Sequence, residues 1–136
     1  MAAPAASERE IQSAVVQWFR AFAPTRGIDP NLLMASASGA VLAGDAKHRA
    51  IQMNNLKRGG LVVGTPDLFL AVPKYVRGIH PQETAFHGLF LEIKADKGKL
   101  SVEQSAQIFL LRNRGYNCVI AFGYDEAMKA IAAYLA

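Results

Sequence analysis

The sequence predicts a mixed α/β fold, in which helices flank both faces of a mixed central sheet. Apolar runs bounded by turn residues predict the strands, and apolar residues at helical spacing predict the helices. A predicted helix separates the last two strands, whereas the two strands before that helix follow each other without one. The first connection favours parallel neighbours and the second antiparallel ones, so the sheet should contain both.

The first predicted element is a helix that runs from Ser7 to about Ala23. Its start fits the S-x-x-E capping box, with Glu10 as the last residue of the motif, and its apolar residues recur on one face. Pro24 and Gly27 end the helix. The six residues before the helix are expected to form a frayed tail.

The middle of the chain predicts three strands and one helix. A short apolar strand over residues 32–36 precedes a weakly amphipathic helix from 46 to about 57. Two longer apolar runs, 67–72 and 86–94, predict neighbouring strands. The segment 73–85 between them is predicted to be a long polar loop, and a hairpin connection would make the two strands antiparallel.

The C-terminal third predicts helix, strand and helix in that order. Ser101 and Gln104 form a second capping box, which opens a helix to about Arg114, and Gly115 is a suitable residue to follow its end. The chain then closes with a strand over residues 116–122 and a helix over residues 125–135.

Length and composition favour one domain over residues 1–136 and a soluble intracellular protein. The net charge of +4 and the pI of about 9.4 favour an anionic partner such as nucleic acid. The single cysteine, Cys118, excludes an intrachain disulfide, and the three histidines lack zinc-ligand spacing. No apolar run is long enough to span a membrane, and phosphate-binding glycine motifs are absent from the sequence.

Two carboxylates and a lysine fall within the neighbouring apolar strands. Asp67 begins the first of these strands, and Glu92 and Lys94 lie near the end of the second. Glu92 and Lys94 are two residues apart, so both should point to one face of the sheet. Such groups are costly to desolvate, and an ion pair alone would gain little stability there. Carboxylates that bind Mg²⁺, with a cation beside them, are what metal-dependent phosphodiester cleavage needs.

The ordered motifs of the chain resemble the PD-(D/E)XK nuclease superfamily and, within it, a stand-alone VRR-NUC domain. These motifs are Gly64-Thr-Pro-Asp67, then Phe90-Leu-Glu92-Ile-Lys94, then Leu100-Ser-x-x-Gln104. The resemblance implies a restriction-endonuclease-like αβββαβ core and a nuclease that depends on Mg²⁺ or Mn²⁺. Small members, common in phages and bacteria, resemble Holliday-junction resolvases that act as homodimers.

The resemblance also implies a role for each residue of the motifs. Asp67, Glu92 and the backbone carbonyl of Ile93 would hold the metal, and Lys94 would orient the attacking water. Gln104 would bind water or the DNA backbone next to the lysine, although it could equally serve only as a helix cap.

An acidic residue of the first helix completes the site in the superfamily. Glu10 is the candidate here, for a second metal or for orienting the lysine, and Glu8 is the weaker candidate. The alternative for Glu10 is a purely structural role in the capping box.

Several polar residues are candidates for binding DNA phosphates. Basic side chains outside the catalytic motif would contact the backbone, and the helix start at Ser101 could bind a phosphate. The candidates are Lys57, Arg58, Lys97, Lys99 and Ser101, and the loop 73–85 could reach DNA arms or a second protomer.

The function expected from these features is structure-selective cleavage of DNA. A homodimer that resolves four-way junctions in recombination or repair is the first expectation, because two symmetric cuts need two sites. Alternatives are flap, nicking or repair cleavage by the same core, or a non-catalytic DNA-binding module. The expected location is the cytoplasm of a bacterium or of a phage-infected host cell.

Overall fold

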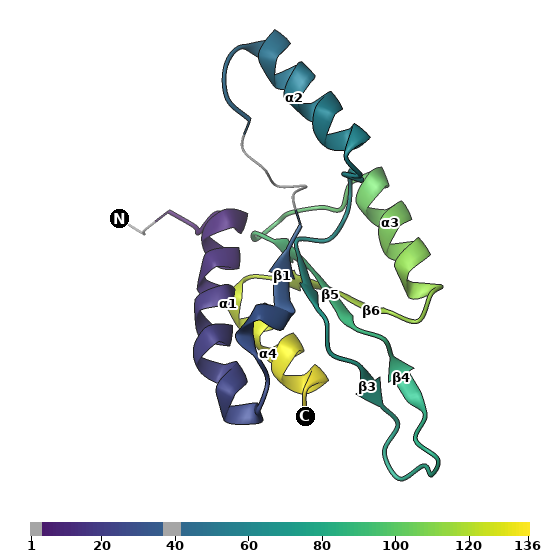
Figure 1. Cartoon of the computed structure of the whole chain (residues 1–136). Helices are drawn as coiled ribbons and strands as arrows, with labels where there is room; N and C mark the ends of the chain where they lie inside the picture. The colour runs from purple at the N-terminus through teal and green to yellow at the C-terminus, as the bar shows by residue number, and fades with distance from the viewer. Residues whose placement is uncertain (1–3, 37–41) are drawn as a thin grey trace.

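The computed structural model describes residues 4–36 and 42–136 and has a four-stranded mixed sheet at its centre (Figure 1). In the order of the sheet, the first strand is antiparallel to the second and the second to the third, whereas the third and fourth are parallel. The predicted mixed sheet is therefore confirmed. In spatial order the strands are β1 (Leu33–Ala35), β2 (Leu68–Leu70), β5 (Leu89–Lys94) and β6 (Asn117–Phe122).

Three helices cover the two faces of the sheet, and a fourth extends away from it. α1 (Glu8–Phe22) and α4 (Tyr124–Tyr134) pack together on one face, and α3 (Val102–Arg112) lies along β6 on the other (Figure 1). α2 (Ala46–Arg58) projects from the sheet and has no buried residue. The order α1, β1, β2, β5, α3, β6 is the expected αβββαβ core.

Both predicted capping boxes are present. The Ser7 hydroxyl accepts a hydrogen bond from the Glu10 backbone N–H at 3.1 Å, and the Ser101 hydroxyl accepts one from the Gln104 N–H at 3.0 Å. In each box the side chain of the last residue accepts from the backbone N–H of the serine in return, so two helix-terminal donors are satisfied.

The four predicted helices all form, with ends within about two residues of those expected from capping and periodicity. After α1, a 3₁₀ turn over Ala23–Arg26 contains Pro24, and Gly27 follows at a φ of 69°. Of the helices in residues 4–36 and 42–136, none has both the length and the apolar character of a membrane-spanning segment.

Strand β5 separates an apolar layer from a polar one, because successive side chains point to opposite faces. Leu91 and Ile93 belong to the hydrophobic core that α1 and α4 cover. Glu92 and Lys94 face the other way, toward α3, and both are nevertheless buried. The strand thus brings two ionisable groups to the less apolar side of the sheet.

The main core fills the space between the sheet and the α1–α4 pair. Its centre consists of side chains from both helices and the middle strands, each at most 1% exposed. Burial of this apolar surface is the main source of stability for the fold. The central side chains are Val15, Phe19, Leu68, Leu70, Leu91, Ile93 and Ile131.

The predicted loop 73–85 is wrong at both of its ends, where the structure has a two-stranded hairpin. β3 (Lys74–Tyr75) pairs antiparallel with β4 (Thr84–Phe86), and Phe86 therefore belongs to β4 rather than to the start of β5. The Lys74 ammonium donates to the carbonyls of Ala133 and Tyr134 at 3.2 and 3.1 Å. It caps the C-terminal end of α4, where a cation is favoured, and so serves the fold.

Replacing Phe19 by alanine should destabilise the protein by about 3–5 kcal/mol, because a ring that is 1% exposed leaves a cavity in the core. Urea denaturation followed by circular dichroism measures this change. The matched control is Phe109→Ala on α3, where the ring is 65% exposed and the expected change is about 0.5 kcal/mol. Equal losses in the two variants would contradict the assignment of the core to the α1–α4 face.

Candidate active site

Asp67 and Glu92 lie opposite each other on adjacent antiparallel strands. Leu68 pairs with Leu91 in the β2–β5 register, so the residue before β2 faces the residue that follows Leu91. The Asp67 carboxylate accepts a hydrogen bond from the Ile93 backbone N–H at 2.7 Å. This bond fixes one carboxylate at the edge of β5, beside the second carboxylate.

Glu92 is a buried acid whose hydrogen bonds are incomplete. Its side chain is 2% exposed, and among the described residues its Oε1 atom has no hydrogen-bond partner. Burial first, and then a hydrogen bond with Asp67 and the charge of Asp67, together raise the pKa of this carboxyl to about 9, against the opposing effect of Lys94. Without a bound cation, this site therefore favours the protonated acid.

Lys94 is held in place by a side chain from α3. Its ammonium donates to Gln104 Oε1 at 2.9 Å and lies 3.9 Å from the Glu8 carboxylate, while its side chain is 7% exposed. Gln104 Oε1 also accepts from the Ser101 N–H at 2.9 Å. Gln104 is therefore both a helix cap and a neighbour of the lysine, because the same oxygen atom accepts both hydrogen bonds.

The structure reverses the predicted order of the two acids on α1. The Glu10 carboxylate accepts from the Ser7 backbone and hydroxyl at 3.4 and 3.0 Å, within the exposed capping box. Glu8 instead approaches Lys94. The helical spacing indicates this position of Glu8 and could have been read from the sequence. Glu8 is three residues before buried Ile11, so the two share a face of the helix.

A glycine allows the chain before β2 to pack against the start of α3. Gly64 has a φ of 93°, and a Cβ atom there would lie 2.4 Å from the Glu103 carbonyl carbon and oxygen. Only glycine fits this position without moving one of the two backbones. The close approach places Asp67 near Gln104, although the two residues come from separate elements of the fold.

The side chains of this region line a small polar pocket of about 230 Å³. Asp67 lines it beside the buried Glu92, and its other residues come from α1, from the chain before β2 and from the start of α3. The arrangement combines acids, a helix N-terminus and a nearby lysine, which is suitable for an anionic substrate and a cation. The lining residues are Glu8, Val63, Gly64, Thr65, Asp67, Ser101 and Gln104.

The donor set fits a hard divalent cation. An unpartnered buried oxygen of Glu92 beside the Asp67 carboxylate provides negative charge that a cation would offset. Within residues 4–36 and 42–136, no three His, Cys, Asp or Glu side chains group together as metal ligands. Mg²⁺ or Mn²⁺ would therefore need backbone or water oxygens as further ligands, and Ile93, whose carbonyl is the predicted ligand, follows Glu92 on β5.

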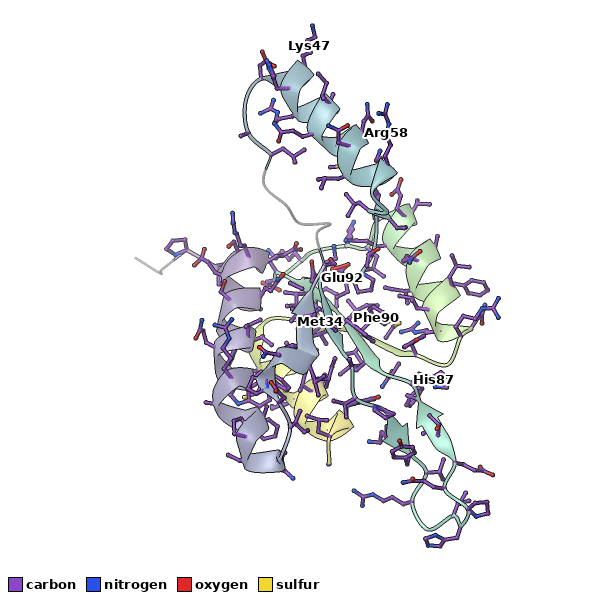
Figure 2. The ribbon with its side chains drawn as sticks, in the orientation of Figure 1. Met34, Lys47, Arg58, His87, Phe90 and Glu92 are labelled. Carbon is purple, nitrogen blue, oxygen red and sulfur yellow. The ribbon has the colours of Figure 1, made fainter. Side chains whose placement is uncertain are left out.

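The candidate DNA-binding residues lie in three places around the pocket. Ser101 lines the pocket itself, as the N-cap of α3. Lys97 and Lys99 are exposed in the turn before α3, and Lys57 and Arg58 are exposed at the C-terminal end of α2 (Figure 2). The structure thus leaves these four cations free of the core but does not bring them into the pocket.

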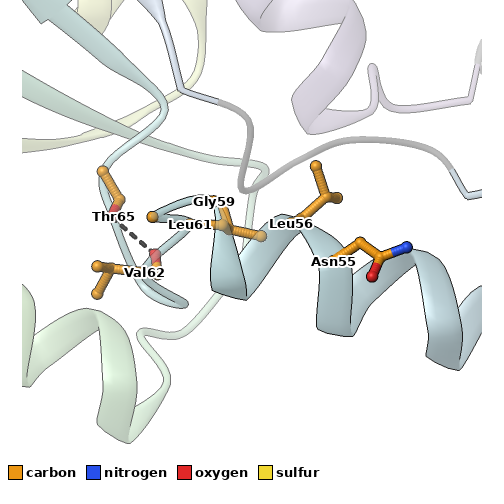
Figure 3. Close-up of a pocket in the computed structure, with 7 residues that line it drawn as sticks. Asn55, Leu56, Gly59, Leu61, Val62 and Thr65 are labelled. Carbon is orange, nitrogen blue, oxygen red and sulfur yellow. Dashed lines mark hydrogen bonds between the residues drawn. The ribbon is translucent and has the colours of Figure 1, made fainter.

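A second pocket, of about 390 Å³, lies where α2 joins the rest of the chain (Figure 3). Asn55, Leu56 and Leu61 contribute to it, and Thr65 closes it through a hydrogen bond to the Val62 carbonyl at 2.7 Å. Thr65 also lines the pocket beside the carboxylates, so the two pockets adjoin.

The geometry therefore defines an α/β protein in which a mixed sheet carries a buried glutamate and a buried lysine beside a partly exposed aspartate. No family model matches the sequence, and no curated protein matches it either. A solved structure described as a VRR_NUC domain protein has the same fold, with a TM-score of 0.71 and 23% identity. The match covers 97% of this chain and 90% of the other, so the chain has the VRR-NUC fold throughout.

In the metal-free protein, the free energy of unfolding should fall as the pH rises from 4.5 to about 9. Between these values the folded protein keeps a proton on Glu92 that the unfolded chain has lost, so a higher pH favours unfolding. Denaturant titrations in EDTA across this range measure the effect. Glu92→Gln, which keeps the shape and removes the ionisation, should abolish this part of the pH dependence, and an unchanged slope would contradict the raised pKa.

Proposed function

We propose that the protein is a metal-dependent nuclease that hydrolyses phosphodiester bonds of DNA. The observation that carries this proposal is the buried Glu92, with its unpartnered oxygen, beside Asp67 and next to a lysine on the VRR-NUC fold. A purely structural ion pair would be a poor explanation, since burying one gains little stability.

The proposed mechanism assigns a separate task to each side chain. Asp67 and Glu92 would hold Mg²⁺ or Mn²⁺, and the bound metal would polarise the scissile phosphate and promote ionisation of water. Lys94, whose ammonium is positioned by its hydrogen bond to Gln104, would orient the nucleophile and offset charge that develops on the phosphate. The Ile93 N–H fixes Asp67 in place, so the carboxylates need little rearrangement.

Glu8 takes the part first expected of Glu10. Its carboxylate lies 3.9 Å from the Lys94 ammonium, and 49% of its side chain is exposed. At this distance and exposure it can bias the position of the lysine, and it can also reach into the pocket as a further oxygen ligand.

The proposed substrate is branched DNA, with the four-way junction first among the candidates. A homodimer with twofold symmetry would present two such sites for paired incisions. Flap, nicking and repair cleavage use the same core chemistry, so selectivity depends on the surfaces around the site.

The test is cleavage of labelled four-way junction, flap, nicked, duplex and single-stranded DNA by wild type and Glu92→Gln, with Mg²⁺, Mn²⁺ or EDTA. Paired nicks in the junction that need metal and fall at least about a hundredfold in the variant are expected, since a ligand is lost. Cutting of other substrates alone would replace the resolvase by a nuclease of another specificity. Intact DNA under every condition, with binding retained, would support the non-catalytic module instead.

The two acids of α1 should differ in their effect on cleavage. Glu8→Gln removes the charge near Lys94 and should lower the rate roughly tenfold, in line with a loss of about 1.4 kcal/mol. Glu10→Gln is the matched control, because it keeps the capping-box oxygen and should leave the rate near that of wild type. Single-turnover kinetics at saturating metal compare them, and the opposite ranking would return Glu10 to the site.

A further inference from the structure

Helix α2 is an arm that contributes nothing to the hydrophobic core. None of its 13 residues is buried, and it projects from the sheet beyond the start of α3 (Figure 1). Its local order comes from the Asp45 N-cap and from two hydrogen bonds between the Gln52 side chain and the Ala43 backbone, at 2.8 and 3.2 Å. A helix held in this way is available for a partner outside the fold.

The charge of this arm is entirely positive. α2 has four basic residues and no acidic residue between Ala46 and Arg58. In residues 4–36 and 42–136 the ion pairs are His48–Asp45 and Lys94–Glu8, so the four cations take no part in one. They are Lys47, Arg49, Lys57 and Arg58, and all four are exposed.

Two of the four cations share one face of the helix. At 3.6 residues per turn, Lys47, Asn54 and Arg58 fall within about 40° of each other, on one outer face. Figure 2 shows Lys47 at the tip of the arm and Arg58 near its base. Arg49 lies on the opposite side, as does Leu56, which lines the pocket at the base of the arm.

The base of the arm is continuous with the proposed active site. The pocket beneath the end of α2 shares Thr65 with the pocket beside Asp67 (Figure 3). From there the outer face extends about 16 Å, from Arg58 to Lys47, which corresponds to about five base pairs of duplex. The arm therefore has the length and position to follow a duplex that leaves the site.

We propose that the outer face of α2 binds the sugar-phosphate backbone of duplex DNA flanking the cleaved bond, with Lys47 and Arg58 as the contacts at its two ends. This inference rests on the proposed function, to which it adds a second binding element outside the catalytic pocket. Charge complementarity identifies the partner, because unpaired cations at this spacing match a polyanion. Contacts of this kind position the duplex and do not read its sequence.

The experiment measures binding of a labelled duplex of about 30 base pairs, in EDTA, across a range of salt concentrations. Lys47→Gln/Arg58→Gln should lower the slope of log affinity against log salt by about 2, since each lost phosphate contact removes about 0.9. Arg49→Gln/Lys129→Gln is the matched control, because it removes the same charge from the opposite side of α2 and from α4. Circular dichroism checks that both variants are folded, and Lys47→Arg/Arg58→Lys should keep the wild-type slope.

Equal slopes of log affinity against log salt for the outer-face variant and the control would mean that net charge alone explains the loss of binding. This result would overturn the inference. A wild type that does not bind duplex would overturn it as well. The cleavage assay separates this inference from the proposed nuclease. Binding with the expected slope but without cleavage would refute only the nuclease, and cleavage without any outer-face effect would refute only the arm.

Discussion

The placement of one buried carboxyl group directly beside a second is the constraint on which the rest of this structure depends. Burial withholds from Glu92 the water that would stabilise its charge, and the neighbouring Asp67 disfavours that charge further. The fold holds them together because β2 and β5 are locked by their ladder and by the core on the α1–α4 face. The burial of apolar side chains on the α1–α4 face therefore stabilises a fold in which these two carboxyl groups stay side by side.

The surroundings of the acidic pair follow from this constraint. Lys94 supplies a positive charge that offsets the carboxylates. Gln104 positions the Lys94 ammonium by a hydrogen bond and also completes the capping box at the start of α3. Gly64 lets the chain that carries Asp67 come close enough to α3 for these contacts to form. Gln104 and Gly64 thus shape the backbone around the site as well as bringing its side chains together.

Local sequence signals were sufficient for much of the fold. The two capping serines and the apolar spacing of α1 set helix ends that the structure confirms, because these signals act within one turn. The antiparallel β2–β5 pair followed from a connection without a helix. The hairpin strands β3 and β4 were missed because they are only two and three residues long and mostly exposed, so no alternating pattern marks them.

The site was less accessible to sequence reasoning than the fold. Motif spacing places Glu92 and Lys94 on one face, and the structure agrees, but the exchange of Glu10 for Glu8 depends on how α1 rotates against the sheet. The Gly64–Glu103 contact joins segments that no local pattern connects. Such tertiary placement becomes visible only once the elements have packed.

Because α2 lies apart from the core, substitutions in this helix have different consequences from substitutions in the rest of the chain. Substitutions in β2, β5 or α1 disturb the packing that holds the acidic pair in place. Because α2 buries none of its side chains, it can gain or lose whole turns, or change its charge, without disturbing that packing. Under the proposed function, the surface that meets DNA can therefore change while the chemistry of the site stays the same.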